Sequence, residues 1–300
     1  MDGFINVLKP PGMTSHDVVG FVRKKIQQKK AGHTGTLDPG VAGVLPVCVG
    51  KATRLSEYIT DQTKGYRGEI TFGRATDSQD AYGSVLWEKE CTHLQYEDFL
   101  TVLPTFIGQI QQLPPMTSAV RVEGQRLYEL ARKGIEVERK QKSVIIHSID
   151  IIHKDWSLPH PKVIFDVSCS KGTYIRTLCH DIGMKLGVGA YLSFLIRTKT
   201  AGFQIQNAYT LEEISSLVAA RDESFLLPME AGISFISALT VGREQEKELL
   251  HGKSIHLPKD HYQMDRIYQA QGPDHKLIAL GRIIIDGTDA FIFKPLKVLG

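Results

Sequence analysis

Apolar residues along this 300-residue chain recur in several short runs with a period of two, the spacing of half-buried strands. In residues 66–72, Tyr66, Ile70 and Phe72 fall on one face and polar side chains on the other. A helical pattern is found near residues 96–106, and further strands are predicted over residues 4–9, 144–152 and 163–169. Short strands interspersed with isolated helices favour an α+β or mixed α/β body.

Two other segments have the spacing of amphipathic helices. Thr14 followed by Asp17 resembles a capping box, and four apolar residues continue at helical spacing: Val18, Val19, Val22 and Ile26. Residues 174–186 form the clearest helix, with a predicted buried stripe of Ile175, Leu178, Cys179, Ile182 and Leu186. Arg176 lies at the edge of this stripe, in the first turn, so we expect its guanidinium to face a cleft at the helix N-terminus.

The pattern changes after residue 237, where short β-rich segments alternate with frequent turns. A separate β-rich domain of about sixty residues fits this pattern better than an extension of the main body. We therefore predict a first domain over residues 1–237 and a second over residues 238–300.

Charge is distributed unevenly along the chain. The 36 Lys and Arg and 33 Asp and Glu give a net charge of only +3, yet residues 1–54 carry a net +5 and residues 121–142 a net +3. Local basic patches on a nearly neutral protein are typical of a surface that binds a polyanion. The alternative is that these side chains only solvate the surfaces of helices.

The sequence also argues against several classes of protein. No apolar run reaches the length of about 18 residues that a membrane helix needs, and the N-terminus lacks the pattern of a secretory signal. The four cysteines form no CxxC pair: Cys48, Cys91, Cys169 and Cys179. We interpret them as reduced thiols of a cytoplasmic protein.

Residues 31–43, AGHTGTLDPGVAG, hold four glycines and a proline and are expected to form a loop. One interpretation of Asp38 is structural, with its carboxylate capping a turn. The other is functional: the glycines allow the backbone close to a ligand, and Asp38 presents a nucleophile or a base. The loop by itself does not decide between them.

Five segments together resemble the TruB family of tRNA pseudouridine-55 synthases in order and spacing: LKPPGMTSHDVV, GHTGTLDPGVAGVLPVCVGKATR, KGYRGEITFGRATDSQDAYG, QLPPMTSAVRVEGQRLYELARKG and SKGTYIRTLCHDIG. The resemblance runs from about residue 4 to residue 203. It implies the α+β pseudouridine synthase fold, with a mixed, largely antiparallel sheet and flanking helices, followed by a PUA-like RNA-binding domain.

The resemblance also implies a reaction and its catalytic residues. A uridine in the T-loop of tRNA is flipped out, its N1 glycosidic bond is broken, and the base is rejoined through C5. Asp38 matches the essential nucleophile, Arg176 the arginine that pairs with it, and Tyr66 a tyrosine that stacks on the base and helps to move the C5 proton. From the residues alone, Tyr66 would equally suit a core position.

Four more residues are expected to bind substrate. His33 matches a histidine that occupies the space of the flipped uridine, since extruding a base costs stacking energy. A hydrolase triad of His33 with Asp38 lacks a nucleophile elbow. Leu195 is expected to line the same pocket, although packing in the core is the ordinary role of a leucine. Lys9 and Lys64 complete the predicted set.

The expected partner is the T-arm stem-loop of tRNA, bound by a monomer without cofactor or metal. An insertion around residues 121–142 is expected to close over the RNA. Thr117 stands where many family members carry a tyrosine, and we expect it to affect packing beneath the site but not the chemistry. A non-catalytic RNA chaperone and a synthase for a different RNA are the rival functions.

Overall fold

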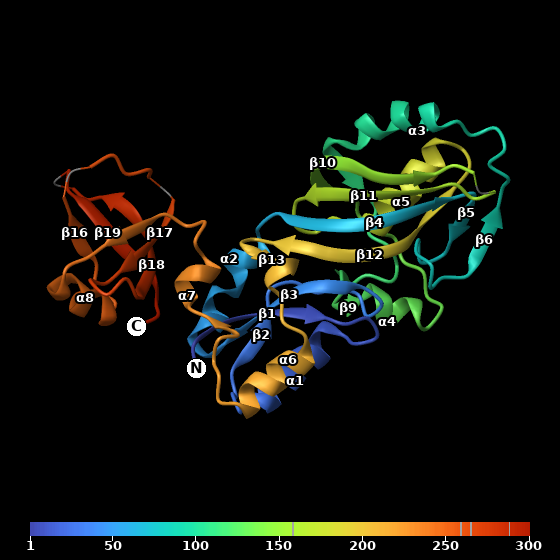
Figure 1. The fold of residues 1–300 in the computed structure, drawn as a ribbon. Helices are drawn as coiled ribbons and strands as arrows, with labels where there is room; N and C mark the ends of the chain where they lie inside the picture. The colour runs from blue at the N-terminus through green and yellow to red at the C-terminus, as the bar shows by residue number, and fades with distance from the viewer. Residues whose placement is uncertain (158, 259, 265, 288) are drawn as a thin grey trace.

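The computed structural model describes residues 1–157, 159–258, 260–264, 266–287 and 289–300. Two sheets dominate these residues, a ten-stranded one in the first part of the chain and a five-stranded one at its C-terminal end (Figure 1). The predicted mixed, largely antiparallel sheet with flanking helices and a smaller β-rich unit is confirmed.

The large sheet has the order β14-β1-β3-β12-β4-β11-β10-β7, with β2 paired to β3 and β13 to β12. Its strands are β1 (Gly3–Lys9), β2 (Ala31–His33), β3 (Ala42–Val49), β4 (Lys64–Phe72), β7 (Gly108–Gln112), β10 (Lys142–Asp155), β11 (Lys162–Cys169), β12 (Ala190–Thr200), β13 (Phe203–Gln204) and β14 (Leu226–Leu227). Strands β12 and β3 run parallel. The other strand pairs described in this sheet are antiparallel.

The helices are short and flank the sheets. They are α1 (Ser15–Lys25), α2 (Ser56–Thr60), α3 (Tyr96–Val102), α4 (Leu127–Ala131), α5 (Ile175–Lys185), α6 (Leu211–Ala219), α7 (Met229–Gly232) and α8 (Arg243–Leu250). Single 3-10 segments follow β3, α3 and β13: η1 (Gly50–Leu55), η2 (Leu103–Phe106) and η3 (Ile205–Asn207). The capping box of Thr14 and Asp17 is confirmed at the start of α1.

The core follows the predicted patterns. In α5, Ile175, Leu178, Cys179 and Ile182 are buried against the sheet, as the helical wheel predicts. Figure 1 shows α5 behind β4 and β11, whose apolar faces meet it. A second cluster lies where α1 and α6 cover β1 and β3. On the opposite face of β4 and β11, polar side chains pair with each other, as in the 2.7 Å ion pair between Arg67 and Asp166.

Two predicted elements need correction. Residues 31–43 are not a loop throughout, because 31–33 form β2 and pair with β3, which begins at Ala42. The glycines in these strands are compatible with strand pairing. The loop itself is therefore limited to residues 34–41, between the end of β2 and the start of β3. The helix predicted over residues 96–106 ends as an α-helix at Val102 and continues as η2, where Pro104 provides no backbone N–H.

The C-terminal unit is a sheet in the order β15-β17-β18-β19-β16, accompanied by α8. Its strands are β15 (Ala238–Thr240), β16 (Ile255–Leu257), β17 (Ile267–Gln271), β18 (Leu277–Ile285) and β19 (Phe291–Val298). Leu280 and Leu299 share an apolar cluster with Phe4 of β1 and Phe203 of β13, so the smaller sheet packs directly on the larger unit. The boundary at 237/238 stays a prediction.

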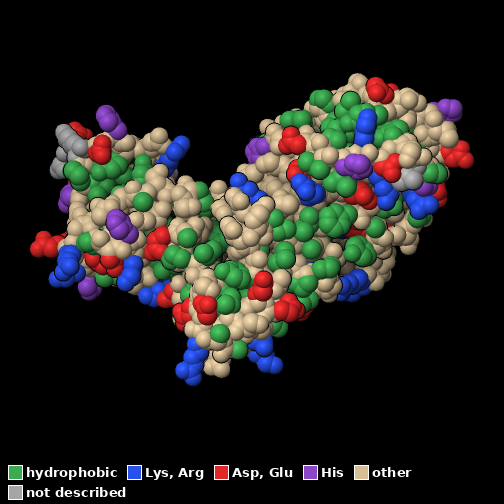
Figure 2. Space-filling model, viewed as in Figure 1, with side chains coloured by type: hydrophobic (Ala, Val, Ile, Leu, Met, Phe, Trp, Pro, Cys, Tyr) green, Lys and Arg blue, Asp and Glu red, His purple; other side chains and the backbone are tan. Residues whose placement is uncertain are grey.

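Two hairpins project from the large sheet. The first joins β5 (Arg74–Thr76) to β6 (Val85–Glu88), and the second joins β8 (Arg121–Val122) to β9 (Gln125–Arg126). The second hairpin and α4 make up the first half of the predicted RNA-binding insertion, residues 121–142. On the face drawn in Figure 2, basic side chains are interspersed with acidic ones.

All four cysteines are buried free thiols. Within the described ranges, none of the helices has the length and apolar character needed to cross a membrane.

Candidate active site

Asp38 lies in the loop between β2 and β3, and neighbouring segments fix the backbone of this loop. The buried hydroxyl of Ser15, in the first turn of α1, accepts from the backbone N–H of Leu37 at 2.9 Å and donates to the Leu37 carbonyl at 3.2 Å. The Asp38 carbonyl accepts from the Val41 N–H at 3.0 Å. The turn is therefore rigid while the Asp38 side chain stays 49% exposed and accessible to a ligand.

Lys9, predicted to bind substrate, is instead fully buried at the end of β1. Its ammonium group donates to the carbonyls of Pro10 at 2.8 Å, Pro39 at 3.1 Å and Val41 at 2.8 Å. Burial lowers its pKa to about 8. Because two of these carbonyls belong to the loop segment directly after Asp38, Lys9 is positioned to hold the loop in place.

Lys64, also predicted to bind substrate, is buried at the start of β4. It donates to the carbonyls of Thr60 at 2.8 Å and Gln62 at 2.9 Å, at the C-terminal end of α2, where carbonyls lack partners within the helix. Burial lowers its pKa to about 8. Its hydrogen bonds, like those of Lys9, are made with backbone carbonyls.

Arg176, in the first turn of α5, is a buried residue that contacts the Asp38 carboxylate. Its Nη2 lies 3.1 Å from the Asp38 Oδ2, and its Nη1 lies 3.5 Å from the Oδ2 of Asp80. Arg176 is only 5% exposed, whereas the Asp38 side chain is half exposed. The arginine thus lies on the buried side of the ion pair, and the aspartate lies on the side that faces solvent.

Asp80 is a site residue that the sequence reasoning missed. It lies in the turn between β5 and β6, where its Oδ1 accepts from the Ser78 hydroxyl at 2.6 Å and from the Tyr82 N–H at 3.0 Å. These bonds leave Oδ2 directed at Arg176. The available signal was its place in TDSQDAYG, an acidic turn within a segment that carries the family resemblance.

Thr117 touches the site directly, which differs from the expected packing role. Both its hydroxyl and its carbonyl accept from the Arg176 guanidinium, the carbonyl at 3.3 Å. Arg176 therefore contacts two carboxylates and Thr117. Its buried Nε has no hydrogen-bond partner within the described part of the chain.

Tyr66 of β4 is almost fully buried and belongs to the same apolar cluster as Leu37 of the Asp38 loop. Burial raises the pKa of its hydroxyl, and the charge of Arg197 opposes part of that rise. Arg197, from β12, is itself buried and donates to the carbonyls of Val44 at 2.7 Å and Gly35 at 3.1 Å. Sequence reasoning also missed this second buried arginine.

His33 ends β2, and its Nδ1 accepts from the backbone N–H of Gly35 at 3.3 Å. Burial lowers the pKa of His33, and the charges of Arg197 and His16 lower it further, so the neutral imidazole is favoured. Leu195 of β12 is partly buried against the cluster that contains Tyr66. The structure thus places Leu195 beside the Tyr66 cluster and His33 at the end of β2, directly before the Asp38 loop.

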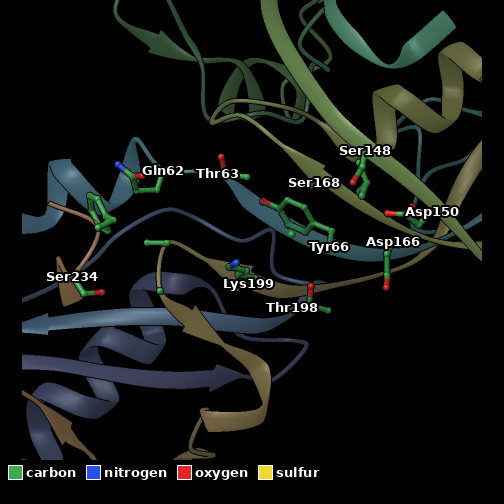
Figure 3. A pocket seen from close by; sticks show the side chains of 15 residues that line it. Gln62, Thr63, Tyr66, Ser148, Asp150, Asp166, Ser168, Thr198, Lys199 and Ser234 are labelled. Atoms are coloured by element: carbon green, nitrogen blue, oxygen red, sulfur yellow. The ribbon is translucent and has the colours of Figure 1, made fainter. Parts of the chain in front are cut away.

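A cleft of about 560 Å³ opens beside Tyr66, between the polar face of the large sheet and the segment that leads to the C-terminal unit. Figure 3 shows Ser148, Asp150, Asp166 and Ser168 directed from adjacent strands along this cleft. Asp38 and Arg176 are not among the described residues that line it. The candidate reactive centre is instead the Asp38–Arg176 pair, where an exposed carboxylate contacts a buried guanidinium.

The described residues offer no group of three or more His, Cys, Asp or Glu side chains able to hold a metal ion. What the arrangement offers is a carboxylate held by a buried guanidinium, beside a buried tyrosine. A carboxylate held in a fixed position can serve as a nucleophile or a base.

Comparison with known proteins identifies the family. Residues 23–175 match the family described as "TruB family pseudouridylate synthase (N terminal domain)", and residues 176–234 match "tRNA pseudouridylate synthase B C-terminal domain". A tRNA pseudouridine synthase B from Symbiobacterium thermophilum is 54% identical over 84% of this chain and 82% of its own length. One from Moorella thermoacetica is 44% identical over 99% of both chains.

Among solved structures, a chain of a Cbf5-Nop10-Gar1 complex is similar with a TM-score of 0.77 and 26% identity, covering 99% of this chain and 85% of that one. A chain of an H/ACA RNP bound to a substrate RNA has a TM-score of 0.76 at 24% identity, covering 99% of this chain and 85% of that one. The expected pseudouridine synthase fold, with a large mixed sheet and a C-terminal β unit, is confirmed. With its sequence, its fold and its paired Asp38 and Arg176 in agreement, this chain belongs to the TruB family of pseudouridylate synthases.

Proposed function

We propose that this enzyme isomerises the T-loop uridine at position 55 of tRNA to pseudouridine. The observation that carries the proposal is the Asp38 carboxylate, half exposed and held by the buried Arg176 at 3.1 Å. The names of its relatives, tRNA pseudouridine synthase B, support tRNA as the substrate.

In the proposed reaction, an Asp38 oxygen attacks the ribose C1′ and the bond from C1′ to N1 breaks, releasing uracil as an anion. The base turns within the site, and its C5 attacks C1′ while the Asp38 oxygen leaves. Loss of the C5 proton and protonation of N1 complete an isomerisation in which no atom is gained or lost. Arg176 aims the carboxylate at C1′.

Tyr66 is proposed to stack on the target base and to accept the C5 proton. For this role Tyr66 would pass its own proton to N1 and take the C5 proton in its place. Burial disfavours the phenolate that forms in between, whereas the positive charge of Arg197 beside the oxygen favours it. His33, as a neutral ring, would fill the space that the flipped uridine vacates. Leu195 would line the base pocket with an apolar side chain. Lys9 would hold the backbone of the Asp38 loop in position, and Lys64 would hold the backbone at the end of α2.

The RNA is proposed to lie along the basic segments at residues 1–54 and 121–142, which carry a net +5 and +3. We assign the C-terminal unit, residues 238–300, to a PUA-like RNA-binding role. We also propose that the enzyme acts as a monomer in the cytoplasm, where its four free thiols would stay reduced.

An isolated T-arm stem-loop and a full-length tRNA transcript, each treated with the enzyme and mapped for pseudouridine, test the substrate assignment. We expect a single modified uridine at the same T-loop position in both RNAs. Modification of full-length tRNA only outside the T-loop would contradict the assignment. Binding of tRNA without modification would favour the RNA chaperone.

A further inference from the structure

Tyr82 is an exposed aromatic residue beside the Asp38 loop, and the chemistry proposed above does not use it. It lies in the turn between β5 and β6 and is 78% exposed, the largest exposed fraction among the large hydrophobic residues that the structure describes. Its hydroxyl lies 3.4 Å from the carbonyl of Gly40, two residues after Asp38. A large aromatic ring that is exposed to solvent buries little apolar surface and therefore contributes little to the stability of the fold.

The approach of the ring to Gly40 is close. A Cβ at residue 40 would stand 2.4 Å from the Tyr82 Cε2 and 2.8 Å from its hydroxyl oxygen. The glycine therefore lets the hydroxyl edge of the ring rest on the Asp38 loop. Most of the ring surface remains open, which leaves it available to a flat ligand.

The backbone of Tyr82 is tied to the reactive pair. Its N–H donates to the Asp80 Oδ1 at 3.0 Å, while the Oδ2 of the same carboxylate lies 3.5 Å from Arg176. The next residue, Gly83, packs so tightly that a Cβ there would be 2.3 Å from the Ser78 hydroxyl. One carboxylate thus sets the positions of both the aromatic ring and the arginine that holds Asp38.

We propose that Tyr82 is a substrate-binding residue, a stacking platform for an unpaired nucleotide next to the flipped uridine; this inference rests on the proposed function. Single-stranded RNA is recognised mainly by stacking of unstacked bases on aromatic side chains. A ring beside the catalytic carboxylate, open on its outer surface and anchored through Asp80, has that geometry. A nucleotide stacked there would hold the RNA backbone on either side of the target at a fixed distance from Asp38.

The alternative is that Tyr82 only packs the Asp38 loop. Two sets of variants separate the roles. Tyr82→Phe and Tyr82→Trp keep an aromatic surface, whereas Tyr82→Leu keeps apolar bulk against Gly40 without a stacking face. Tyr82→Ala removes both. Phe235→Ala is a matched control, because Phe235 is also an exposed aromatic residue, 41% exposed, at the cleft away from Asp38.

Binding is measured with a full-length tRNA transcript, and each variant is placed on an Asp38→Asn background so that no turnover occurs. We expect Tyr82→Ala and Tyr82→Leu to raise the Kd by about 5- to 50-fold, as for loss of one stacked base. Tyr82→Phe, Tyr82→Trp and Phe235→Ala should stay within about twofold of the parent. With Asp38 restored, Tyr82→Ala should raise KM and leave kcat at saturating tRNA nearly unchanged.

An unchanged Kd for both Tyr82→Ala and Tyr82→Leu would overturn the proposal. An equal rise in Kd for Tyr82→Phe and Tyr82→Ala would also overturn it, because the effect would then come from the contact of the hydroxyl with Gly40. A fall in kcat without a change in Kd would assign Tyr82 to loop packing. Mapping the modified uridine in the same transcript keeps the two proposals separate. Modification outside the T-loop would reject position 55 without changing the Kd comparison.

Discussion

The guanidinium of Arg176 lies 3.1 Å from the Asp38 carboxylate, although Arg176 is buried and the Asp38 side chain is half exposed. A buried cation next to a partly solvated anion fixes the direction of the anion without hiding it from substrate. Asp80 places a second carboxylate near the same guanidinium, on the more buried side of the site. The two carboxylates therefore differ in their surroundings, because the Asp38 side chain is half exposed and the Asp80 side chain is mostly enclosed by protein.

Asp80→Asn should impair turnover more than binding. The amide keeps the shape of the turn but removes the charge at 3.5 Å from Arg176, so the arginine loses part of its alignment on Asp38. We expect kcat to fall by about 10- to 100-fold, as for a small misplacement of a catalytic group. The measurement is tritium release from tRNA labelled at C5 of uridine.

Asp77→Asn is the matched control for this prediction, because Asp77 lies in the same turn and accepts from the Ser84 N–H at 2.9 Å. Its kcat should stay within about threefold of the wild type. Equal losses in both variants would show that the turn as a whole matters, and not the charge next to Arg176.

Thr117→Val should lower kcat by about 5- to 20-fold, because a hydrogen bond to a charged group is lost while the Thr117 carbonyl still accepts from Arg176. Thr117→Ser keeps the hydroxyl and should retain most activity. Single-turnover rates at saturating tRNA measure the effect. Full activity of Thr117→Val would contradict this prediction and would mean that Thr117 affects only packing, as the sequence suggests.

Asp181→Asn should stabilise the protein at neutral pH. Burial in α5 raises the pKa of Asp181 from 3.8 to about 6, so its charge opposes folding above pH 6. The folded state takes up a proton before the unfolded state as the pH falls from 6 to 3.8, and the penalty disappears below that range. Allowing for partial exposure, we expect a gain of about 1–2 kcal/mol at pH 7.

Thermal or urea unfolding at pH 7 and at about pH 4 checks this prediction. The gain from Asp181→Asn should be present at pH 7 and largely lost at pH 4. A gain of equal size at both pH values would mean that the amide stabilises α5 through packing or hydrogen bonding and not through removal of charge.

Local patterns in the sequence predicted local structure well. The capping box at Thr14 and the buried stripe of α5 depend on residues a few positions apart, so their geometry can be read from spacing. The same stripe predicted that Arg176 would face inward at a helix N-terminus. Its partner Asp38 came only from the family resemblance, because an isolated aspartate in a glycine-rich loop is also a common turn residue.

The residues that were missed or misplaced depend on contacts between distant segments. Asp80 reaches Arg176 from a turn between two hairpin strands, and Arg197 supports the Asp38 loop because β12 runs parallel to β3. Lys9 and Lys64 were predicted to bind substrate, but both are buried, which is rare for lysine. Backbone carbonyls that surround both ammonium groups make their burial possible.

Asp38→Asn isolates the carboxylate on which the proposed chemistry depends. The measurement is pseudouridine mapping of a tRNA transcript after incubation with equal, saturating amounts of wild type and variant, with the Kd of each for the same transcript. We predict one pseudouridine in the T-loop with the wild type, none with Asp38→Asn, and Kd values within a few-fold. Complete conversion of the uridine by Asp38→Asn would contradict the assignment of Asp38 as the nucleophile.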